Sequence, residues 1–432
     1  MRFKRKNYLN GIDWTMNAIH LNSQKHTSSS NDFIIVMELQ NIPDCKKLDL
    51  LLRTCIRKFP LLKGHPSRGI NLAPYWKYND SIVLEKNILS IVNIKNEHSI
   101  SNNICEFSNE PMNTDFALFR LFMVDNKSFL AAKFDHRLFD GRGAEGFLSL
   151  VQREWLELDT FTESNNKKNP SQLKNWGDKF TSGKVFNRTM KLKMENCIPE
   201  SLSKPVTKET LSYSHNLITY NKVESAKLLE NANKHAGLFM TMPFILANFI
   251  MCFHAILKKR GQTSGNYIIP VTIDQRQNKE VLKQVFFNNW SMIFFRISQE
   301  ELKSPIKIIE SIKEQMFENM SNKFSFHMTN SSYLMRILPL RIMNKLMTWM
   351  LKGTTGSFSF SFLKESVYEF NNFMDTEILN LYHIPNMPVQ PGIGLFFSSF
   401  DGKINAVLSY IESILSDQEL AYIEKILKGL II

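Results

Sequence analysis

Apolar and polar positions in the first part of the chain follow the patterns expected of strands and helices in turn. Residues 128–134 are apolar enough for a buried strand. After a short polar loop, apolar side chains recur at the spacing of one helix face. These side chains are Phe147, Leu148, Val151, Trp155 and Leu158. Up to about Asp159, the pattern predicts an α/β fold in which strands and helices alternate.

A change in composition after Asp159 predicts how the chain divides into domains. Residues 160–184 are polar and rich in Asn, Lys and Ser, which is typical of a connecting segment of marginal order. Residues 212–221 favour a strand, which a helical pattern follows. No fixed-period repeat indicates a solenoid. We expect a first domain over residues 1–159, a connecting segment over 160–205 and a second domain over 206–432.

One apolar run is long enough to raise the question of a membrane span. Residues 237–257 carry no Asp, Glu, Lys or Arg, and ~20 apolar residues suffice to cross a bilayer. Thr241, before Pro243, favours a helix start. Asn248 and His254 would be costly to bury in lipid. A helix in the core of a large domain is also apolar on every side, and we interpret the run as a central helix of the second domain.

Composition fits a cytoplasmic protein with more than one domain. The chain has 432 residues, of which 43% are hydrophobic, enough to bury the cores of two or three domains. Its 33 phenylalanines and 20 methionines could line a wide tunnel, although both also fill ordinary cores. The five cysteines show no CxxC spacing, so neither a zinc site nor a redox motif is expected. The N-terminus lacks the features of a signal peptide.

The net charge of +12 indicates an acidic partner of some kind. Basic residues are spread along the chain, and no pattern resembles a nucleic-acid-binding module, so we expect no nucleic acid partner. The phosphates of a small molecule, an acidic protein surface and anionic lipid headgroups are the candidates that remain. Residues 331–353 mix Met, Leu and Trp with Arg and Lys, as a helix on a membrane surface would. Packing against the domain is the alternative, and Pro339 interrupts the pattern.

The candidate chemistry lies in residues 133–147, where His136 stands four residues before Asp140 and Gly141. A neutral histidine can accept a proton at physiological pH because its ordinary pKa is about 6.5. Asp140 could orient the imidazole or pin the loop through a cation elsewhere. Gly141 would permit a backbone bend that a side chain obstructs. A short motif of three fixed positions also occurs in plain surface loops.

This HxxxDG motif resembles that of the CoA-dependent acyltransferase superfamily, which includes chloramphenicol acetyltransferase, plant BAHD acyltransferases, wax ester synthases and peptide-synthetase condensation domains. Three further segments are similar to the family's, in the family's order. They are residues 48–65, residues 243–278 with an Asp-x-Arg pattern at Asp274 and Arg276, and residues 392–410. The resemblance implies two chloramphenicol-acetyltransferase-like α/β sandwich domains with a tunnel at their interface.

The resemblance also implies a role for each matching residue. His136 corresponds to the general base, which takes a proton from the acceptor as it attacks an acyl thioester. Asp140 corresponds to a structural aspartate that pairs with Arg276 and so ties the two halves together. Ser361 falls where some relatives place a hydroxyl that stabilises the oxyanion. Ser357 and Ser359 share its alternation, so a strand with outward serines is the other interpretation.

Two departures bear on which branch of the family the chain resembles. Asp135 stands where condensation domains and wax ester synthases carry a first histidine, and the DFGWG-like signature of the plant branch is missing. We expect an acyltransferase that takes acyl-CoA, or an acyl carrier protein, as donor and a small-molecule alcohol or amine as acceptor, with no permanently bound cofactor and no metal. An amide-forming condensation enzyme fed by carrier proteins and a catalytically inactive binding protein of the same fold are the alternatives.

Overall fold

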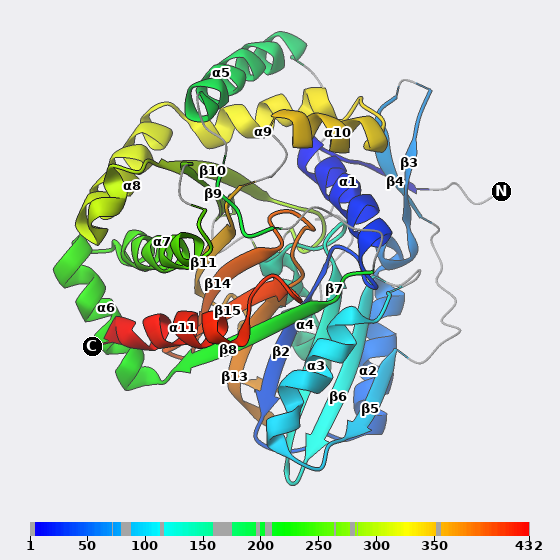
Figure 1. The fold of residues 1–432 in the computed structure, drawn as a ribbon. Helices are drawn as coiled ribbons and strands as arrows, with labels where there is room; N and C mark the ends of the chain where they lie inside the picture. Colours follow the sequence, from blue (N-terminus) through cyan, green and yellow to red (C-terminus); the bar gives the residue numbers. More distant parts are fainter. Residues whose placement is uncertain are drawn as a thin grey trace.

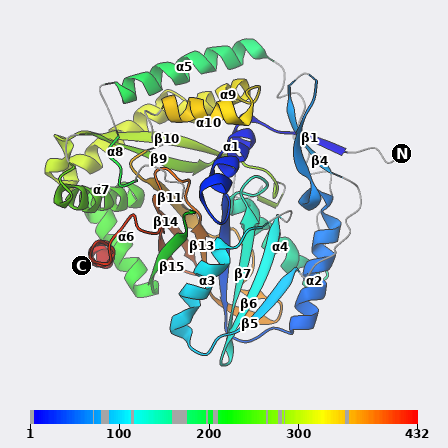
Figure 2. The same cartoon turned by 45° about the vertical axis from the view of Figure 1, so that its right-hand side comes forward.

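The computed structural model describes residues 5–70, 72–78, 88–112, 116–158, 175–195, 199–203, 210–262, 265–276, 281–282, 284–350 and 356–431. Within them the chain forms two six-stranded sheets that lie side by side, each covered by helices (Figures 1 and 2). The predicted α/β class and the two-lobed architecture are confirmed. A small third sheet joins β1 (Arg5–Tyr8), β4 (Pro74–Tyr78) and β3 (His65–Arg68).

The first sheet is built mainly from the first half of the sequence. Its strands, in spatial order, are β12 (Asn372–Phe373), β13 (Thr376–Pro385), β2 (Asp32–Leu39), β7 (Lys127–Asp135), β6 (Ala117–Val124) and β5 (Leu89–Asn93). Helices α2 (Cys45–Lys58) and α4 (Gly141–Trp155) pack on one face of this sheet, and α3 (Ile100–Asn109) packs on the other. Because both faces are covered, β2 and β7 are buried along almost their whole length.

The second sheet belongs to the second half of the sequence. Its strands, in spatial order, are β10 (Trp290–Ile297), β9 (Tyr267–Asp274), β11 (Ser359–Glu365), β14 (Ile393–Phe400), β15 (Lys403–Ile411) and β8 (Tyr213–Tyr220). The helices α6 (Lys222–Ala236), α7 (Thr241–Lys259), α8 (Pro305–Ser321) and α11 (Asp417–Lys428) share its hydrophobic core. The predicted strand at 212–221 and the helix after it correspond to β8 and α6.

Strand β13 crosses from the second half of the sequence into the first sheet. It pairs antiparallel with β2, with His383 opposite Ile35. The two lobes therefore do not separate cleanly at the connecting segment, because β12 and β13 follow residue 206 in sequence and lie in the first lobe. Part of the predicted connecting segment forms the helix α5 (Trp176–Met194), and its residues 160–174 lie outside the described residues.

Helix α7 accounts for the apolar run at 237–257. It is the one helix among the described residues that is long and apolar enough to span a membrane, and 67% of its apolar window is buried inside the protein. Its side chains pack in the core of the second lobe, among them Ile250 and Phe253, which are fully buried. The interpretation as a central core helix is confirmed.

A layer of helices covers the top of the molecule in Figure 1, where the two lobes meet. It consists of α1 (Gly11–His26), α5, α9 (Phe324–Met335) and α10 (Leu340–Met350), and α1 contacts both α9 and α10. The segment 331–353 is thus two helices separated near Pro339, and α10 packs against α1. Its residues 351–353 lie outside the described residues, and contact with a membrane surface stays a prediction.

Candidate active site

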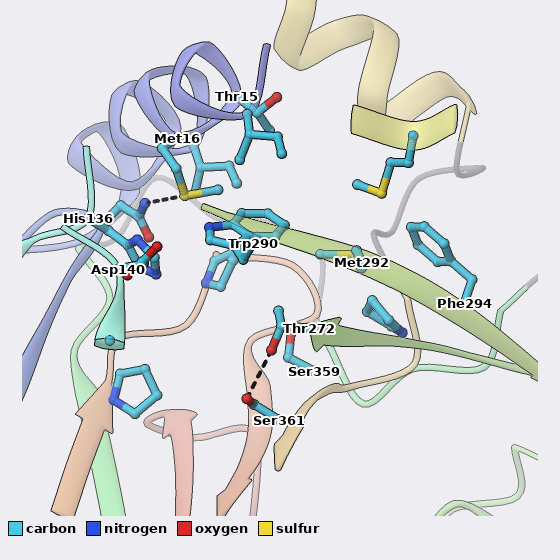
Figure 3. Close-up of a pocket in the computed structure, with 18 of the residues that line it drawn as sticks. Thr15, Met16, His136, Asp140, Thr272, Trp290, Met292, Phe294, Ser359 and Ser361 are labelled. Carbon is cyan, nitrogen blue, oxygen red and sulfur yellow. Dashed lines mark hydrogen bonds between the residues drawn. The ribbon is translucent and has the colours of Figure 1, made fainter. Parts of the chain in front are cut away.

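A cavity of about 830 Å³ lies between the two lobes, and both halves of the sequence line it. The first lobe contributes α1, the loop after β7, the start of α4 and the end of β13, and the second contributes β9, β10, β11 and β14. Side chains of α5 and α9 complete the wall. Figure 3 shows His136 and Asp140 on one side of this space, with Trp290 and Met292 between them and Phe294.

His136 directly follows β7, so a buried strand fixes where its ring lies. Its backbone N–H donates to the Asn31 carbonyl at 3.0 Å. The imidazole packs edge-on against the Phe33 ring, with 5.2 Å between ring centroids. The side chain is half-buried and borders the cavity. The buried strand predicted for residues 128–134 is confirmed as part of β7.

Asn288 determines which ring nitrogen of His136 carries the proton. The Trp290 indole N–H donates to Asn288 Oδ1 at 3.0 Å, and Asn288 Nδ2 donates to the His136 carbonyl at 3.0 Å. An indole nitrogen can only donate, so Asn288 Oδ1 is an acceptor. The same oxygen lies 3.2 Å from His136 Nδ1. Nδ1 must therefore carry the hydrogen, which leaves the lone pair of the neutral ring on Nε2.

The surroundings of His136 favour its neutral form. Burial lowers the pKa of the imidazole below its ordinary value of 6.5, and this effect outweighs the opposing influence of the Asp140 carboxylate. A neutral imidazole with its lone pair on Nε2 is the form that can accept a proton. The ring is thus in a base-competent state at neutral pH.

Asp140 pins the loop behind His136. One carboxylate oxygen accepts from the backbone N–H of Gly143 at 2.8 Å and caps the N-terminus of α4. The other accepts from the backbone N–H of Asn289 at 2.8 Å and lies 2.8 Å from Arg276 Nη2. Of the two roles that the sequence leaves open, the geometry favours the one in which Asp140 pairs with a distant cation.

Arg276 is buried beside Asp140 and joins the end of β9 to the loop that carries His136. Its Nη1 lies 3.2 Å from Asp274 Oδ1, and its Nε donates to the Gln284 carbonyl at 3.2 Å. Burial alone would lower the pKa of Arg276, but the two carboxylates raise it above its ordinary value. The side chain is therefore a permanent cation shared between Asp140 and Asp274.

Gly141 lies at the site for a reason other than the one expected. It is the first residue of α4, and it is not among the glycines with a positive φ, so the expectation of a special backbone bend is wrong. A Cβ added at Gly141 would lie 3.2 Å from Nδ1 of His383. The missing side chain leaves room for a second histidine beside the cavity.

Ser361 lies on β11 with its hydroxyl near the cavity (Figure 3). Thr272 Oγ1 donates to Ser361 Oγ at 2.9 Å, which leaves the Ser361 proton available to a bound group. Ser359 also borders the cavity, whereas Ser357 accepts from the Ile268 backbone N–H at 3.2 Å. The three serines are therefore not equivalent, because Ser359 and Ser361 border the cavity and Ser357 does not. The oxyanion role of Ser361 stays a prediction.

The rest of the cavity wall is mostly apolar. Methionines supply a large share of it, from α1, α5, β10, α9 and the segment after β13. They are Met16, Met190, Met194, Met292, Met328, Met335 and Met387. Thioether side chains are flexible and fit irregular apolar groups. The sequence left open whether methionine fills cores or lines a tunnel, and these seven residues line the cavity.

Four residues of the site escaped the sequence analysis. Asn288 lies just before β10 and Trp290 is the first residue of that strand, and no sequence pattern marks either as functional. His383 is a single histidine in an apolar strand, which is the usual appearance of a core residue. Glu145 follows the motif by four residues, and an acidic residue on the buried face of an amphipathic helix is the one signal that could have indicated it. Among the described residues, no group of three or more His, Cys, Asp or Glu side chains could hold a metal ion.

Comparisons with known proteins are informative at the level of the fold. No protein-family model matches the sequence, and no curated protein is similar to it. Among solved structures, the trichothecene 15-O-acetyltransferase of Fusarium sporotrichioides is 12% identical, with a TM-score of 0.70 over 99% of this chain and 95% of that chain. The first condensation domain of the calcium-dependent antibiotic synthetase is 10% identical, with a TM-score of 0.72 over 99% and 95%.

A third structure extends this range of similar proteins. The cyclization-docking bidomain of EpoB from Sorangium cellulosum is 13% identical, with a TM-score of 0.63 over 99% of this chain and 85% of that chain. This chain therefore has the two-lobed fold that acetyltransferases and condensation domains share, as the sequence resemblance predicts.

Proposed function

We propose that this chain, which has the fold of the CoA-dependent acyltransferase superfamily, transfers an acyl group from a thioester to a hydroxyl or amine. The observation that carries the proposal is the state of His136. Its ring borders a cavity between the lobes, and Asn288 directs its lone pair to Nε2. Burial keeps it neutral. A fold alone does not imply an activity, so the argument depends on these residues.

In the proposed reaction, His136 Nε2 takes the proton of the acceptor hydroxyl or amine as its oxygen or nitrogen attacks the thioester carbonyl. A new C–O or C–N bond forms, and the carbonyl oxygen becomes an oxyanion. The Ser361 hydroxyl donates to this oxyanion. When the tetrahedral intermediate collapses, the C–S bond breaks and the thiolate receives the proton from the His136 imidazolium.

The apolar wall supports a bulky and largely apolar substrate. A cavity of about 830 Å³ is far larger than an acetyl group requires and is within the range of sites for drug-sized ligands. The chain's positive charge suits the phosphates of acyl-CoA, which we propose as the donor. A carrier-protein thioester is the second candidate donor, because the structures of condensation domains superpose on 99% of this chain.

The test is a thiol-release assay with purified protein, a series of acyl-CoAs from acetyl to long-chain, and panels of alcohols and amines. We expect acyl-dependent release of free CoA, and His136→Ala should remove at least 99% of it while the far-UV circular dichroism spectrum stays the same. The matched control is His254→Ala, because His254 lies outside the cavity lining and bonds Tyr267. Wild-type turnover by His136→Ala would overturn the proposal. Release from an acyl carrier protein with none from CoA would favour the second donor.

A further inference from the structure

A second histidine, His383, borders the same cavity as His136. It lies on β13 opposite Ile35 of β2, close to the first residue of α4. Its side chain is 8% exposed. The reaction proposed above makes no use of it, because His136 alone can take and return the proton.

Glu145 holds the His383 ring in place. His383 Nε2 lies 2.7 Å from Glu145 Oε1. The other carboxylate oxygen accepts from the Val367 backbone N–H at 2.8 Å and from Arg142 Nη1 at 3.3 Å. Burial alone would raise the pKa of Glu145, but His383 and Arg142 hold it below its usual value. Glu145 is therefore a carboxylate, fixed by three donors.

This arrangement determines the tautomer of His383. A carboxylate can only accept hydrogen bonds, so Nε2 must carry a hydrogen, and the lone pair of the neutral ring is on Nδ1. A carboxylate that orients a histidine in this way leaves the opposite nitrogen ready to interact with another group. In the part of the chain that the structure describes, no hydrogen bond to His383 Nδ1 is formed. A Cβ added at Gly141 would lie 3.2 Å from this nitrogen, so the missing side chain leaves space beside it.

A purely structural link between β13 and α4 would need only the Nε2 bond. Such a role explains Glu145 and Arg142, but it does not explain why His383 borders the cavity with Nδ1 unbonded. Counted over the whole residue, His20 and His215 have almost the same exposure as His383, 5% and 6% against 7%, and neither borders the cavity. In a mostly apolar cavity, the few polar groups on the wall usually orient the ligand.

We propose that His383 is a substrate-binding residue, which accepts through Nδ1 a hydrogen bond from a hydroxyl or amine of the substrate other than the group that reacts. Glu145 is its positioning residue. The inference deepens the proposed function, since it names the substrate class as molecules with a second hydroxyl or amine. It implies that the substrate spans the cavity, with the reacting group at His136 and the second polar group at His383.

The first experiment needs no substrate. The full-length protein is treated briefly with diethyl pyrocarbonate, which modifies unprotonated and accessible imidazole nitrogens, and each histidine peptide is quantified by mass spectrometry. We expect His383 to react at least ~10-fold faster than His20 and His215, although the three are equally buried. Equal protection of all three would overturn the inference, because Nδ1 would then be closed to a ligand.

The second experiment compares His383→Gln with the wild type. Glutamine places a donor near the position of Nε2, so it can keep the bond to Glu145, but it has no atom that replaces Nδ1. We expect the KM for diols and amino alcohols to rise roughly 10-fold, as the loss of one hydrogen bond implies. The KM for mono-alcohols of equal length should change less than twofold. The matched control, His254→Gln, should leave both KM values unchanged.

A purely structural role predicts a different result, in which His383→Gln raises both KM values alike or neither, and that outcome would overturn the inference. The two proposals also fail separately. Turnover that survives His136→Ala contradicts the proposed function, whereas the reactivity of His383 toward diethyl pyrocarbonate does not depend on turnover at all.

Discussion

His136 is held in one protonation state and one tautomer by neighbours of different kinds. Burial disfavours the imidazolium, and the Asn288 amide oxygen binds the proton on Nδ1. Asn288 is itself fixed, since its backbone N–H donates to Asp13 Oδ1 at 3.0 Å and its oxygen accepts from Trp290. The base therefore depends on a neutral amide, and a charge at position 288 would change its titration.

The wild type should keep its activity below pH 6.5, because the pKa of His136 is lowered and activity is lost only as the pH falls through that pKa. Asn288→Asp adds a negative charge where an amide oxygen now lies 3.2 Å from His136 Nδ1, and this charge favours the imidazolium. We expect the acid limb of kcat/KM to move about 1 to 3 pH units higher. A pH profile measures this, with Asn41→Asp, an exposed position beyond the far end of β2, as control. If the acid limb of kcat/KM stays at the wild-type pH in Asn288→Asp, Asn288 does not face the titrating group.

At the scale of elements, the Asp140 and Arg276 pair joins the start of α4 to the end of β9. Both side chains are almost fully buried, 7% and 1% exposed. A buried ion pair adds little net stability, but removal of one partner leaves an uncompensated charge that is largely shielded from solvent. The link also connects the two lobes at the point where the cavity passes between them.

Asp140→Ala and Arg276→Ala should each lower the free energy of unfolding by about 3 to 5 kcal/mol. The double variant should lose much less than the sum, because it removes both charges of the buried pair and leaves only Asp274, which is 22% exposed, without its cation. Urea unfolding followed by circular dichroism measures these values. Asp401→Ala breaks the exposed pair with Lys222, 54% and 60% exposed, and should cost at most about 1 kcal/mol. Single variants as stable as this control would contradict the buried link.

Local patterns predicted the elements around the motif well, because the apolar periodicity of β7 and α4 follows directly from burial on a sheet and on one helix face. The pairing of Asp140 with Arg276 came from a family resemblance and not from spacing. Asn288 and the pair of Glu145 with His383 could not be predicted in either way. They depend on which strand lies beside β2 and on how the chain before β10 turns back toward β7, and no short stretch of sequence contains that information.

At the scale of the whole molecule, the first lobe is incomplete without the second half of the chain. Strand β13 covers one edge of β2, and its Leu381 and Ile384 pack into the cores on opposite faces of the first sheet. The same strand carries His383 to the cavity. Because this strand both completes the first sheet and carries a residue of the site, the stability of the first sheet is coupled to the assembly of the site.

Residues 1–205, produced alone, should aggregate or remain poorly structured, because β2 would keep β7 but lose β13 and so expose an apolar strand edge. Co-production with residues 206–432 should give a soluble complex, since the second fragment supplies β13. Size-exclusion chromatography and circular dichroism of each fragment and of the complex test this expectation, with the full-length chain as control. A monomeric 1–205 fragment that unfolds cooperatively would show that the first lobe is stable without β13, and the site would then depend on the second lobe only for its own residues.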